Sequence, residues 1–346
     1  MSGGRRLGFA LAGLGKLSAN QIAPAFERTQ RCRLAGIVTG SPDEAARWQE
    51  RYGIPARSVY DYGSIDRMAE NPDIDVVYVV TPNALRAPIA IAAARAGKHV
   101  FCEKPLEISV ARCREMIEGC RAAGTRLGVA YRCRFDPHHL ECVRLAREEV
   151  FGRVRMIQGA FGFAVGEPPL WRLDRSLSGG GPLIDVGIYC LQTARMITGR
   201  EPLAVSATEV RNEGGRFGDV EQALTFQLEF PDGVLAHFGC SYEQAMNEFT
   251  VFAEHGSFGM KPAYAYQHNR AWRSDGAPFA FPEIDQFAAE MDDFALRIET
   301  GEPSPVDGEE GVRDVRILLA AYESARTGRR VELVGRARAG GQGGRG

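Results

Sequence analysis

The feature that most constrains the fold is a glycine turn between a short apolar run and a helical pattern. Residues 7–12 have the pattern of a buried strand, and Gly13-Leu-Gly15-Lys-Leu-Ser18 then opens a helix. This is G-x-G-x-x-small in the strand, turn, helix setting that gives the motif its meaning. Gly13 permits the tight turn, Gly15 lets a pyrophosphate approach the backbone, and Ser18 allows close helix packing. The alternative is an ordinary glycine turn.

The residues that follow keep alternating between apolar runs and helical patterns. The expected strands are 7–12, 34–38, 76–81, 99–102 and 126–130, and the expected helices are 19–28, 43–52, 87–96 and 110–123. This alternation predicts a doubly wound parallel sheet. We therefore assign residues 1–134 to an α/β domain of the Rossmann type that binds a dinucleotide.

Beyond residue 135 the pattern changes to longer runs in which apolar and polar residues alternate with period two. The expected strands are 154–163, 203–210, 223–230, 234–240 and 249–254, and the expected helices are 137–149, 184–198, 286–300 and 308–327. Such runs predict an open, mainly antiparallel sheet that helices cover on one face. The free face predicts a homodimer or homotetramer. Residues 135–334 thus form an α+β domain for substrate binding and oligomerisation, and 335–346 a disordered glycine-rich tail.

Composition excludes several classes of protein. The 346 residues carry 42 Lys+Arg against 44 Asp+Glu, a net charge of -2, which argues against a nucleic-acid partner. No apolar stretch approaches the ~20 residues that span a bilayer, so no membrane contact is expected. The first residues lack the pattern of a signal peptide, and we expect a cytoplasmic location. The eight cysteines form no C-x-x-C pair, which predicts reduced, packed thiols and no metal site.

The end of the second strand bears on the choice of dinucleotide. A site that prefers NAD usually offers an acidic residue there, which binds the ribose 2′-hydroxyl. Here the sequence is Thr39-Gly40-Ser41, whose hydroxyls and amides can bind a 2′-phosphate, with Lys16 or Arg47 as the cation. This sequence predicts NADP as the preferred cofactor.

A lysine follows the strand 99–102. Lys104 stands at the carboxyl edge of the parallel sheet, where doubly wound folds bind their ligands, and is followed by Pro105. We expect it near the nicotinamide, with a cis bond to Pro105. A solvated lysine at a strand end is the alternative.

A second constellation begins with three glycines. In Gly179-Gly-Gly-Pro182-Leu-Ile-Asp185-Val-Gly-Ile-Tyr189 the proline suits a first helical turn, and Asp185 and Tyr189 share one helix face. A nearby Lys104 ammonium is expected to lower the pKa of the Tyr189 phenol and make it a proton acceptor. Alternatively, Tyr189 is a core residue and Asp185 a charge favoured by the helix dipole.

Together these motifs resemble the glucose-fructose oxidoreductase and inositol dehydrogenase (Gfo/Idh/MocA) family, and within it the glucose-fructose oxidoreductase branch, over residues 7–330. The matching segments include Ala96-Gly-Lys-His-Val100, Cys102-Glu-Lys-Pro105, Tyr131-Arg-Cys133, Trp171-Arg-Leu173 and Asp185-x-Gly-Ile-Tyr189. One departure is Arg86, at a place where relatives commonly carry histidine. The resemblance implies a Rossmann domain, NADP as cofactor and a sugar as substrate.

The resemblance also implies roles for individual residues. The implied catalytic residues are Lys104, Tyr189 and Asp185, and the implied substrate-binding residues are Lys104, Tyr131, Arg172, Asp185 and Tyr189. The implied cofactor-binding residues are Gly13, Leu14, Gly15, Lys16, Leu17, Thr39, Gly40, Ser41, Tyr60, Thr81, Pro82, Asn83, Glu103, Lys104, Arg132, Trp171 and Arg172.

We therefore expect an NADP-dependent sugar oxidoreductase that oxidises an aldose at C1 to the aldonolactone. Two courses remain open after that step: the hydride passes to a second sugar and gives a polyol with the cofactor retained, or NADPH is released at each turnover. A non-catalytic sensor of dinucleotide or sugar is the alternative from another class. The presence of Lys104, Asp185 and Tyr189 together argues against the sensor.

Overall fold

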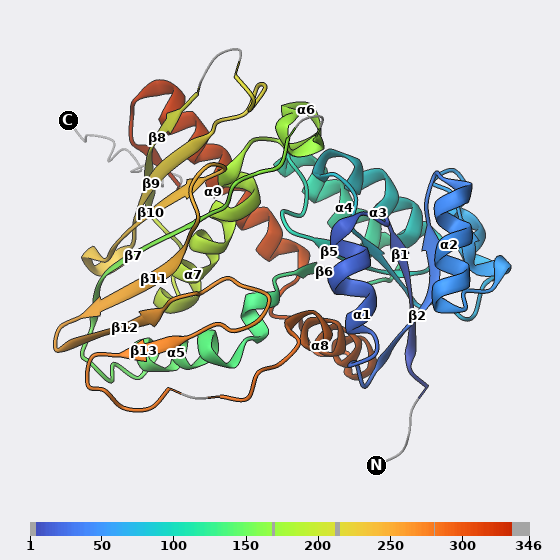
Figure 1. The fold of residues 1–346 in the computed structure, drawn as a ribbon, viewed down its shortest axis with the longest axis horizontal. Helices are drawn as coiled ribbons and strands as arrows, with labels where there is room; N and C mark the ends of the chain where they lie inside the picture. Colours follow the sequence, from blue (N-terminus) through green and yellow to red (C-terminus); the bar gives the residue numbers. More distant parts are fainter. Residues whose placement is uncertain (1–4, 168–169, 212–214, 280, 334–346) are drawn as a thin grey trace, which may run out of the picture.

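The fold is described from a computed structural model in which residues 5–167, 170–211, 215–279 and 281–333 are placed. Two sheets organise the chain (Figure 1). The N-terminal sheet has the order β3-β2-β1-β4-β5-β6, and the C-terminal sheet the order β13-β12-β11-β7-β10-β9-β8-β14. The predicted tail, 335–346, lies outside the described residues.

The strands of the N-terminal sheet are all parallel, which confirms the predicted double winding. They are β1 (Leu7–Ala12), β2 (Cys32–Val38), β3 (Val59–Tyr60), β4 (Val76–Val79), β5 (His99–Glu103) and β6 (Leu127–Ala130). Alternate side chains of β1 enter different cores: Ala10 and Ala12 belong to one, Phe9 and Leu11 to the other. Both faces of this sheet are therefore covered.

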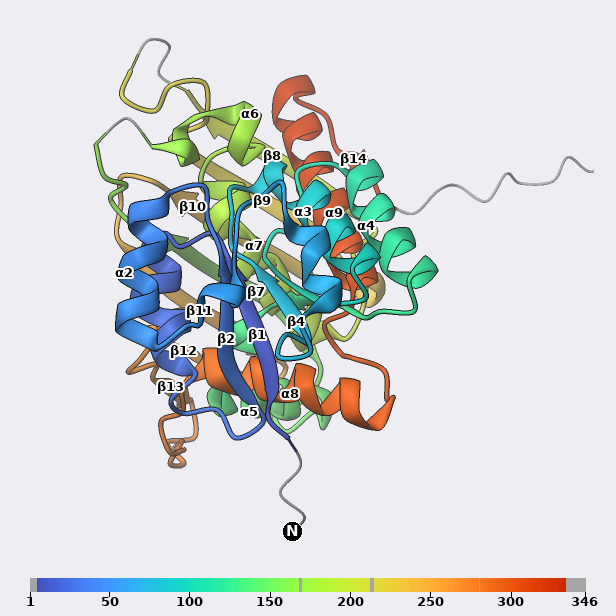
Figure 2. The same ribbon diagram turned by 90° about the vertical axis from the view of Figure 1, so that its right-hand side faces the viewer.

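Helices from distant parts of the sequence cover the two faces (Figure 2). On the face of Ala10 lie α3 (Arg86–Arg95) and α4 (Val110–Ala122). On the face of Phe9 lie α1 (Ala23–Ala25), α2 (Pro42–Tyr52) and α8 (Gln286–Thr300). The helix α8 follows the C-terminal sheet in sequence, yet its Phe294 stacks on Phe101 of β5, with ring centroids 4.8 Å apart. A helix from the C-terminal part of the chain thus returns to the N-terminal sheet.

The C-terminal sheet is mainly antiparallel, as predicted. Its strands are β7 (Val154–Gly162), β8 (Ala204–Val210), β9 (Ala223–Glu229), β10 (Leu235–Ser241), β11 (Met246–Ala253), β12 (Gly256–Met260), β13 (Ala271–Arg273) and β14 (Val331–Glu332). One pair, β7 with β10, is parallel. Between β7 and β10 the chain forms helices and then the strands β8 and β9 of the same sheet, so these two neighbours are not joined by a hairpin.

One face of the C-terminal sheet packs against α5 (Pro137–Arg147), α7 (Ile188–Thr198) and α9 (Gly308–Thr327). Along β9 the residues Phe226 and Leu228 are buried in this core, whereas Thr225 and Gln227 are exposed. The period-two pattern in the sequence therefore predicted the covered face correctly.

Two predicted helices begin differently from the prediction. The segment 19–28 forms a π-helical turn, Ser18–Ile22, followed by the short α1, and 184–198 forms a π-helical turn, Leu183–Gly187, followed by α7. Among the described residues no helix is long and apolar enough to cross a membrane. All eight cysteines are buried and unpaired, as predicted.

Candidate active site

The two sequence motifs that carry Lys104 and Asp185 meet directly. Lys104 follows β5, and its peptide bond to Pro105 is cis, as expected. Its Nζ donates a hydrogen bond to the main-chain oxygen of Asp185 at 2.6 Å and lies 3.3 Å from the Oδ1 atom of the same residue. The fold thus joins positions 81 residues apart into one ion pair.

Asp185 lies in a π-helical turn and presents two acceptors to this lysine, its main-chain oxygen and its carboxylate. A π turn is a local interruption of the usual helical hydrogen bonding and is common at functional sites. Here the Asp185 carbonyl faces Lys104, and Tyr189 lies one turn further along, at the start of α7. Asp185 and Tyr189 therefore both reach the carboxyl edge of the parallel sheet.

The three glycines before this turn are required by close packing. A Cβ atom on Gly180 would lie 1.9 Å from the phenol oxygen of Tyr322, and one on Gly181 would lie 2.4 Å from the main-chain oxygen of Glu221. The buried Glu221 carboxylate accepts hydrogen bonds from the Gly181 and Leu183 amides and from Tyr322. This anchor fixes the start of the turn. Nothing in the sequence pattern pointed to it.

Three groups hold Asp185 as an anion. Arg172 Nε donates to its Oδ2 at 3.0 Å, and the Tyr242 hydroxyl donates to the same oxygen at 3.1 Å. Burial opposes ionisation, but the charges of Arg172 and Lys104 outweigh it and lower the pKa of Asp185 to about 2. The reverse holds for Lys104, where burial lowers the pKa below the ordinary lysine value in spite of Asp185. Tyr242 follows β10 and was missed, because no local pattern marks it.

The cation beside the Tyr189 phenol is Arg132 and not Lys104. Arg132 Nε donates a hydrogen bond to the Tyr189 oxygen at 3.2 Å, whereas Lys104 Nζ lies over the ring, 4.8 Å from its centroid. Burial raises the pKa of Tyr189 well above the ordinary phenol value, and the Arg132 charge is the largest influence in the other direction. The prediction that Lys104 lowers the pKa of Tyr189 is therefore wrong. Desolvation dominates and raises this pKa, and the Arg132 charge opposes the rise.

Arg132 is buried and fixed by several partners. Its Nη1 donates to Gln286 Oε1 at 2.5 Å, and its Nη2 donates to the main-chain oxygen of Tyr264 at 2.6 Å. The guanidinium also lies over the ring of Tyr266, 4.7 Å from the centroid. Gln286 begins α8, so the helix that returns to the dinucleotide fold holds the arginine that touches Tyr189. The family resemblance implied that Arg132 binds the cofactor. Its contact with Tyr189 was not predicted.

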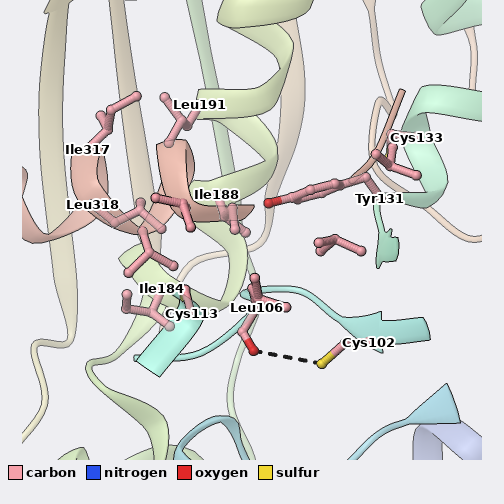
Figure 3. Close-up of a cluster of buried hydrophobic side chains, with 14 of the residues drawn as sticks. Cys102, Leu106, Cys113, Tyr131, Cys133, Ile184, Ile188, Leu191, Ile317 and Leu318 are labelled. Carbon is pink, nitrogen blue, oxygen red and sulfur yellow. Dashed lines mark hydrogen bonds between the residues drawn. The ribbon is translucent and has the colours of Figure 1, made fainter. Parts of the chain in front are cut away.

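Tyr131 does not fit its implied role in binding substrate. Its ring is buried, and its phenol points toward Ile188 and the core between α7 and α9 (Figure 3). Burial, followed by the charge of Asp314, raises the pKa of Tyr131 well above the ordinary value. The ring borders a cavity of about 10 Å³ beside Lys104 and Tyr189, space for a single water. The hydroxyl itself is directed into the core.

Arg86 holds the main chain on either side of Lys104. Its Nε donates to the main-chain oxygen of Thr81 at 3.1 Å, and its Nη1 donates to the oxygens of Glu103, at 2.8 Å, and of Pro105. The guanidinium is fully buried and thus clamps the ends of β4 and β5 together. Arg86, which stands where relatives commonly carry histidine, therefore fixes the main chain on both sides of Lys104.

The glycine turn after β1 forms a cradle that fits a dinucleotide. Gly13 has a φ of +95°, and a Cβ atom there would lie 3.0 Å from Thr81 Cγ2, whereas Gly15 faces open space. Ser18 Oγ donates to the Gly13 oxygen at 2.6 Å and closes the turn. The hydroxyl of Thr81 is buried without a hydrogen-bond partner in the part of the chain that the structure describes. An orphaned polar atom beside an open glycine turn is what a bound pyrophosphate or nicotinamide amide satisfies.

The ribose end of this cradle contains a carboxylate that the sequence pattern did not predict. Thr39 Oγ1 donates a hydrogen bond to Glu44 Oε2 at 2.5 Å, and Ser41 Oγ accepts from the Glu44 amide. The segment Thr39-Gly40-Ser41 itself contains no acidic residue. The first turn of α2 nevertheless brings one to it.

The remaining residues assigned to the cofactor divide into two groups. Lys16 is exposed at the turn beside the buried Leu14 and half-buried Leu17, Pro82 follows β4, and Trp171 lies against Arg172, whose guanidinium is 4.6 Å from the ring centroid. Others are engaged elsewhere. Tyr60 is a core residue whose hydroxyl accepts from Asn71, Asn83 donates to the Ser178 oxygen, and the Glu103 carboxylate accepts from Tyr78.

A larger cavity lies beside the site. It measures about 440 Å³ and shares Tyr266 and Gln286 with the surroundings of Arg132. Its other lining residues include Asp136, His138, Asn269 and Glu283. Within the described ranges, no three side chains of histidine, cysteine, aspartate or glutamate are grouped to hold a metal ion.

Comparison with known proteins decides the family. Residues 7–131 match the model of the oxidoreductase family with an NAD-binding Rossmann fold, and residues 139–259 match the GFO/IDH/MocA C-terminal domain. The chain belongs to the Gfo/Idh/MocA oxidoreductase family. The resemblance inferred from the motifs is thereby confirmed, together with the two kinds of sheet that the family combines.

Relatives within the Gfo/Idh/MocA family act on several sugars or sugar derivatives. D-xylose 1-dehydrogenase [NADP(+)] of Haloarcula marismortui is 30% identical over 335 residues, 94% of this chain and 92% of the relative. The 1,5-anhydro-D-fructose reductase of Ensifer adhaerens is 32% identical, over 87% of this chain and 91% of the relative. The structure of aldose-aldose oxidoreductase from Caulobacter crescentus, complexed with glycerol, is 41% identical with a TM-score of 0.90, over 95% of this chain and 100% of that one.

Proposed function

We propose that this chain is an NADP-dependent sugar oxidoreductase that oxidises an aldose at C1 to the aldonolactone. The observation that carries the proposal is the convergence of Lys104, Asp185 and Tyr189 on one place beside the glycine cradle. A non-catalytic sensor requires the cradle to bind its dinucleotide, but it does not require a buried ion pair such as that of Lys104 and Asp185. The xylose dehydrogenase and the aldose-aldose oxidoreductase support an aldose as the substrate class.

NADP fits the residues of the cradle. The turn at Gly13 and Gly15 would hold the pyrophosphate, and Thr39, Gly40 and Ser41 would face the adenosine ribose. When bound, the nicotinamide supplies the acceptor for the hydride that leaves C1 of the sugar. The D-xylose dehydrogenase of Haloarcula marismortui carries NADP(+) in its name.

The chain's own residues handle the proton and the sugar hydroxyls. As C1 loses its hydrogen as hydride, the proton of the anomeric hydroxyl passes to the phenolate form of Tyr189 and the C1 carbonyl of the lactone forms. The Arg132 guanidinium stabilises the charge on the phenol oxygen at 3.2 Å. Lys104, held by Asp185, donates to the sugar oxygen, and Arg172 with Asp185 orients the neighbouring hydroxyls.

The experiment is a panel of aldoses, D-xylose and D-glucose among them, assayed for growth of absorbance at the reduced-nicotinamide band with added NADP. Turnover in the wild type and its loss in Tyr189→Phe support the proposal. A wild-type protein that binds NADP and forms no oxidised product from any aldose, with or without added NADP, contradicts it and favours the sensor.

A second function is favoured by the structure of an aldose-aldose oxidoreductase at 41% identity. In this course a dinucleotide held in the cradle would supply hydride to the carbonyl of a second sugar, which would also take up one proton and become a polyol. Incubation with aldose and no added dinucleotide distinguishes the two courses. Equal amounts of aldonate and polyol, far beyond the amount of enzyme, indicate transfer between sugars, whereas dependence on added NADP indicates an ordinary dehydrogenase.

A further inference from the structure

The carboxylate of Glu44 lies at the adenosine-ribose end of the cradle. Its Oε2 is 2.5 Å from the Thr39 hydroxyl, which stands immediately after β2. In dinucleotide folds the end of this strand is where the ribose 2′ position is recognised. The acidic residue usually belongs to the strand end itself, and here it comes from the first turn of α2.

The local structure holds Glu44 in this place. Ser41 is the N-cap of α2 and accepts a hydrogen bond from the Glu44 amide at 3.3 Å, and its own amide donates to Thr39 Oγ1 at 3.2 Å. The positive end of the helix dipole favours the ionised carboxylate in a first turn. Burial, followed by the charge of Glu44, raises the pKa of the nearby Tyr62. Its carboxylate therefore stands in a defined position beside Thr39.

An anion at this position treats the two dinucleotides differently. It can accept a hydrogen bond from the 2′-hydroxyl of NAD, whereas it repels the 2′-phosphate of NADP. The candidate cations for a phosphate, Lys16 and Arg47, both have exposed side chains, where attraction is weakened by water and salt. The segment 39–41 alone predicts a strong preference for NADP, and Glu44 opposes it.

We propose that Glu44 binds the adenosine-ribose 2′-hydroxyl, so that this chain accepts NAD as well as NADP. The inference rests on the proposed function in one respect, namely that the cradle holds a nicotinamide dinucleotide. It goes beyond that function because it gives the chain a second cofactor and assigns the discrimination between them to one residue on α2.

The test measures binding of two fragments that carry the ribose end and no nicotinamide, ADP-ribose and 2′-phospho-ADP-ribose, by calorimetry. Glu44→Gln keeps the shape of the side chain and removes its charge. Asp43→Asn is the matched control, because Asp43 is exposed in the same helical turn and its loss changes the net charge equally. Hydrogen bonds to charged groups are strong enough that losing this one costs ADP-ribose about tenfold in affinity.

The wild type is expected to bind the two fragments within about tenfold of each other. Glu44→Gln is expected to weaken ADP-ribose and strengthen 2′-phospho-ADP-ribose, which raises the affinity ratio at least tenfold, and Asp43→Asn is expected to change the ratio less than twofold. With aldose, the ratio of kcat/KM for NADP to that for NAD should follow the binding ratio. Equal shifts in the two variants, or a Glu44→Gln protein with an unchanged ratio, overturn the role of Glu44 and leave the proposed function standing. A wild type that binds neither fragment and neither dinucleotide overturns both.

Discussion

Arg132 donates its Nε hydrogen to the phenol oxygen of Tyr189 at 3.2 Å. The two side chains come from opposite parts of the fold, since Arg132 follows the last strand of the parallel sheet and Tyr189 starts α7 beneath the second sheet. The arginine is fixed in turn by Gln286 of α8. Three separate segments therefore set the position of one phenol oxygen, which is the precision that proton transfer requires.

Replacing Tyr189 by phenylalanine removes the proton acceptor and keeps the ring. Turnover with aldoses should fall by ~10²- to 10⁴-fold, the range for general acid-base groups. Binding of NADP, measured by fluorescence titration, should be unchanged, because the ring still packs against Phe161 and Tyr264. A variant with near-normal turnover contradicts Tyr189 as the acceptor and brings Asp185 forward as the base.

The pH dependence distinguishes the two cations near this tyrosine. Tyr189 must be deprotonated to accept the proton, so kcat/KM should rise with pH through its pKa. Arg132→Lys weakens the bond to the phenol oxygen, and the rising limb should move to higher pH because the phenolate loses stabilisation. Lys104→Met should lower kcat and move this limb less, since Nζ lies over the ring and not at the oxygen. A larger shift in Lys104→Met than in Arg132→Lys would contradict this assignment.

The position of Lys104 was predictable because the topology of a doubly wound sheet places strand ends at one edge, and its meeting with Asp185 and Tyr189 was implied by the family resemblance. Which cation contacts the Tyr189 phenol oxygen was not predictable. Arg132 and Lys104 lie at adjacent strand ends, and the sequence does not say where either side chain points. Glu44 could not be predicted for a related reason: the recognised pattern places the acidic residue at the strand end, whereas this carboxylate returns from the helix after it. The π-helical turn before Tyr189 has the same apolar pattern as an α-helix, so periodicity could not reveal it.

Arg86 should affect turnover through Lys104. Arg86→Met leaves the main-chain oxygens of Thr81, Glu103 and Pro105 without their shared donor. A displacement of about 1 Å at the reacting groups can cost of the order of 10²-fold in rate, and kcat should fall by about that factor while NADP binding changes little. Arg86→Lys should recover part of kcat, because one ammonium can still reach some of these oxygens. Equal activity of Arg86→Met and wild type, at equal thermal stability, would show that the clamp does not position Lys104.

A buried charge network beneath α7 should dominate the stability of this part of the fold. Arg195 Nη1 donates to Asp314 at 2.7 Å and to Glu310 at 2.8 Å, which joins α7 to α9. Arg195→Met leaves these carboxylates buried without their shared cation and should cost about 3–5 kcal/mol in urea unfolding at pH 7. The exposed Arg200, just beyond α7, offers the control Arg200→Met, for which little change is expected.

The same network gives a pH signature. Burial opposes ionisation of Glu310, but the charges of Arg134 and Arg195 outweigh it and lower the pKa to about 2. A carboxylate with a lowered pKa stabilises the fold above its unfolded pKa, near ~4.3, and loses that contribution as pH falls toward the folded value. The stability difference between wild type and Arg195→Met should therefore shrink as pH falls from about 4.3 toward 2. A difference that stays constant over this range contradicts ionised Glu310 as the partner of Arg195.

The outer face of the C-terminal sheet predicts how copies of the chain associate. Along β9 and β10 the side chains of Thr225, Gln227 and Leu235 are exposed on the face opposite the helices. Two copies can place these faces together about a two-fold axis, and we expect a dimer or a tetramer built from dimers. Because a two-fold contact meets its own copy, Thr225→Lys should set like charges against each other and shift sedimentation toward the monomer. Ala46→Lys on the exposed side of α2 adds the same charge and should leave the assembly intact. A wild type that sediments as a monomer at micromolar concentration contradicts the prediction.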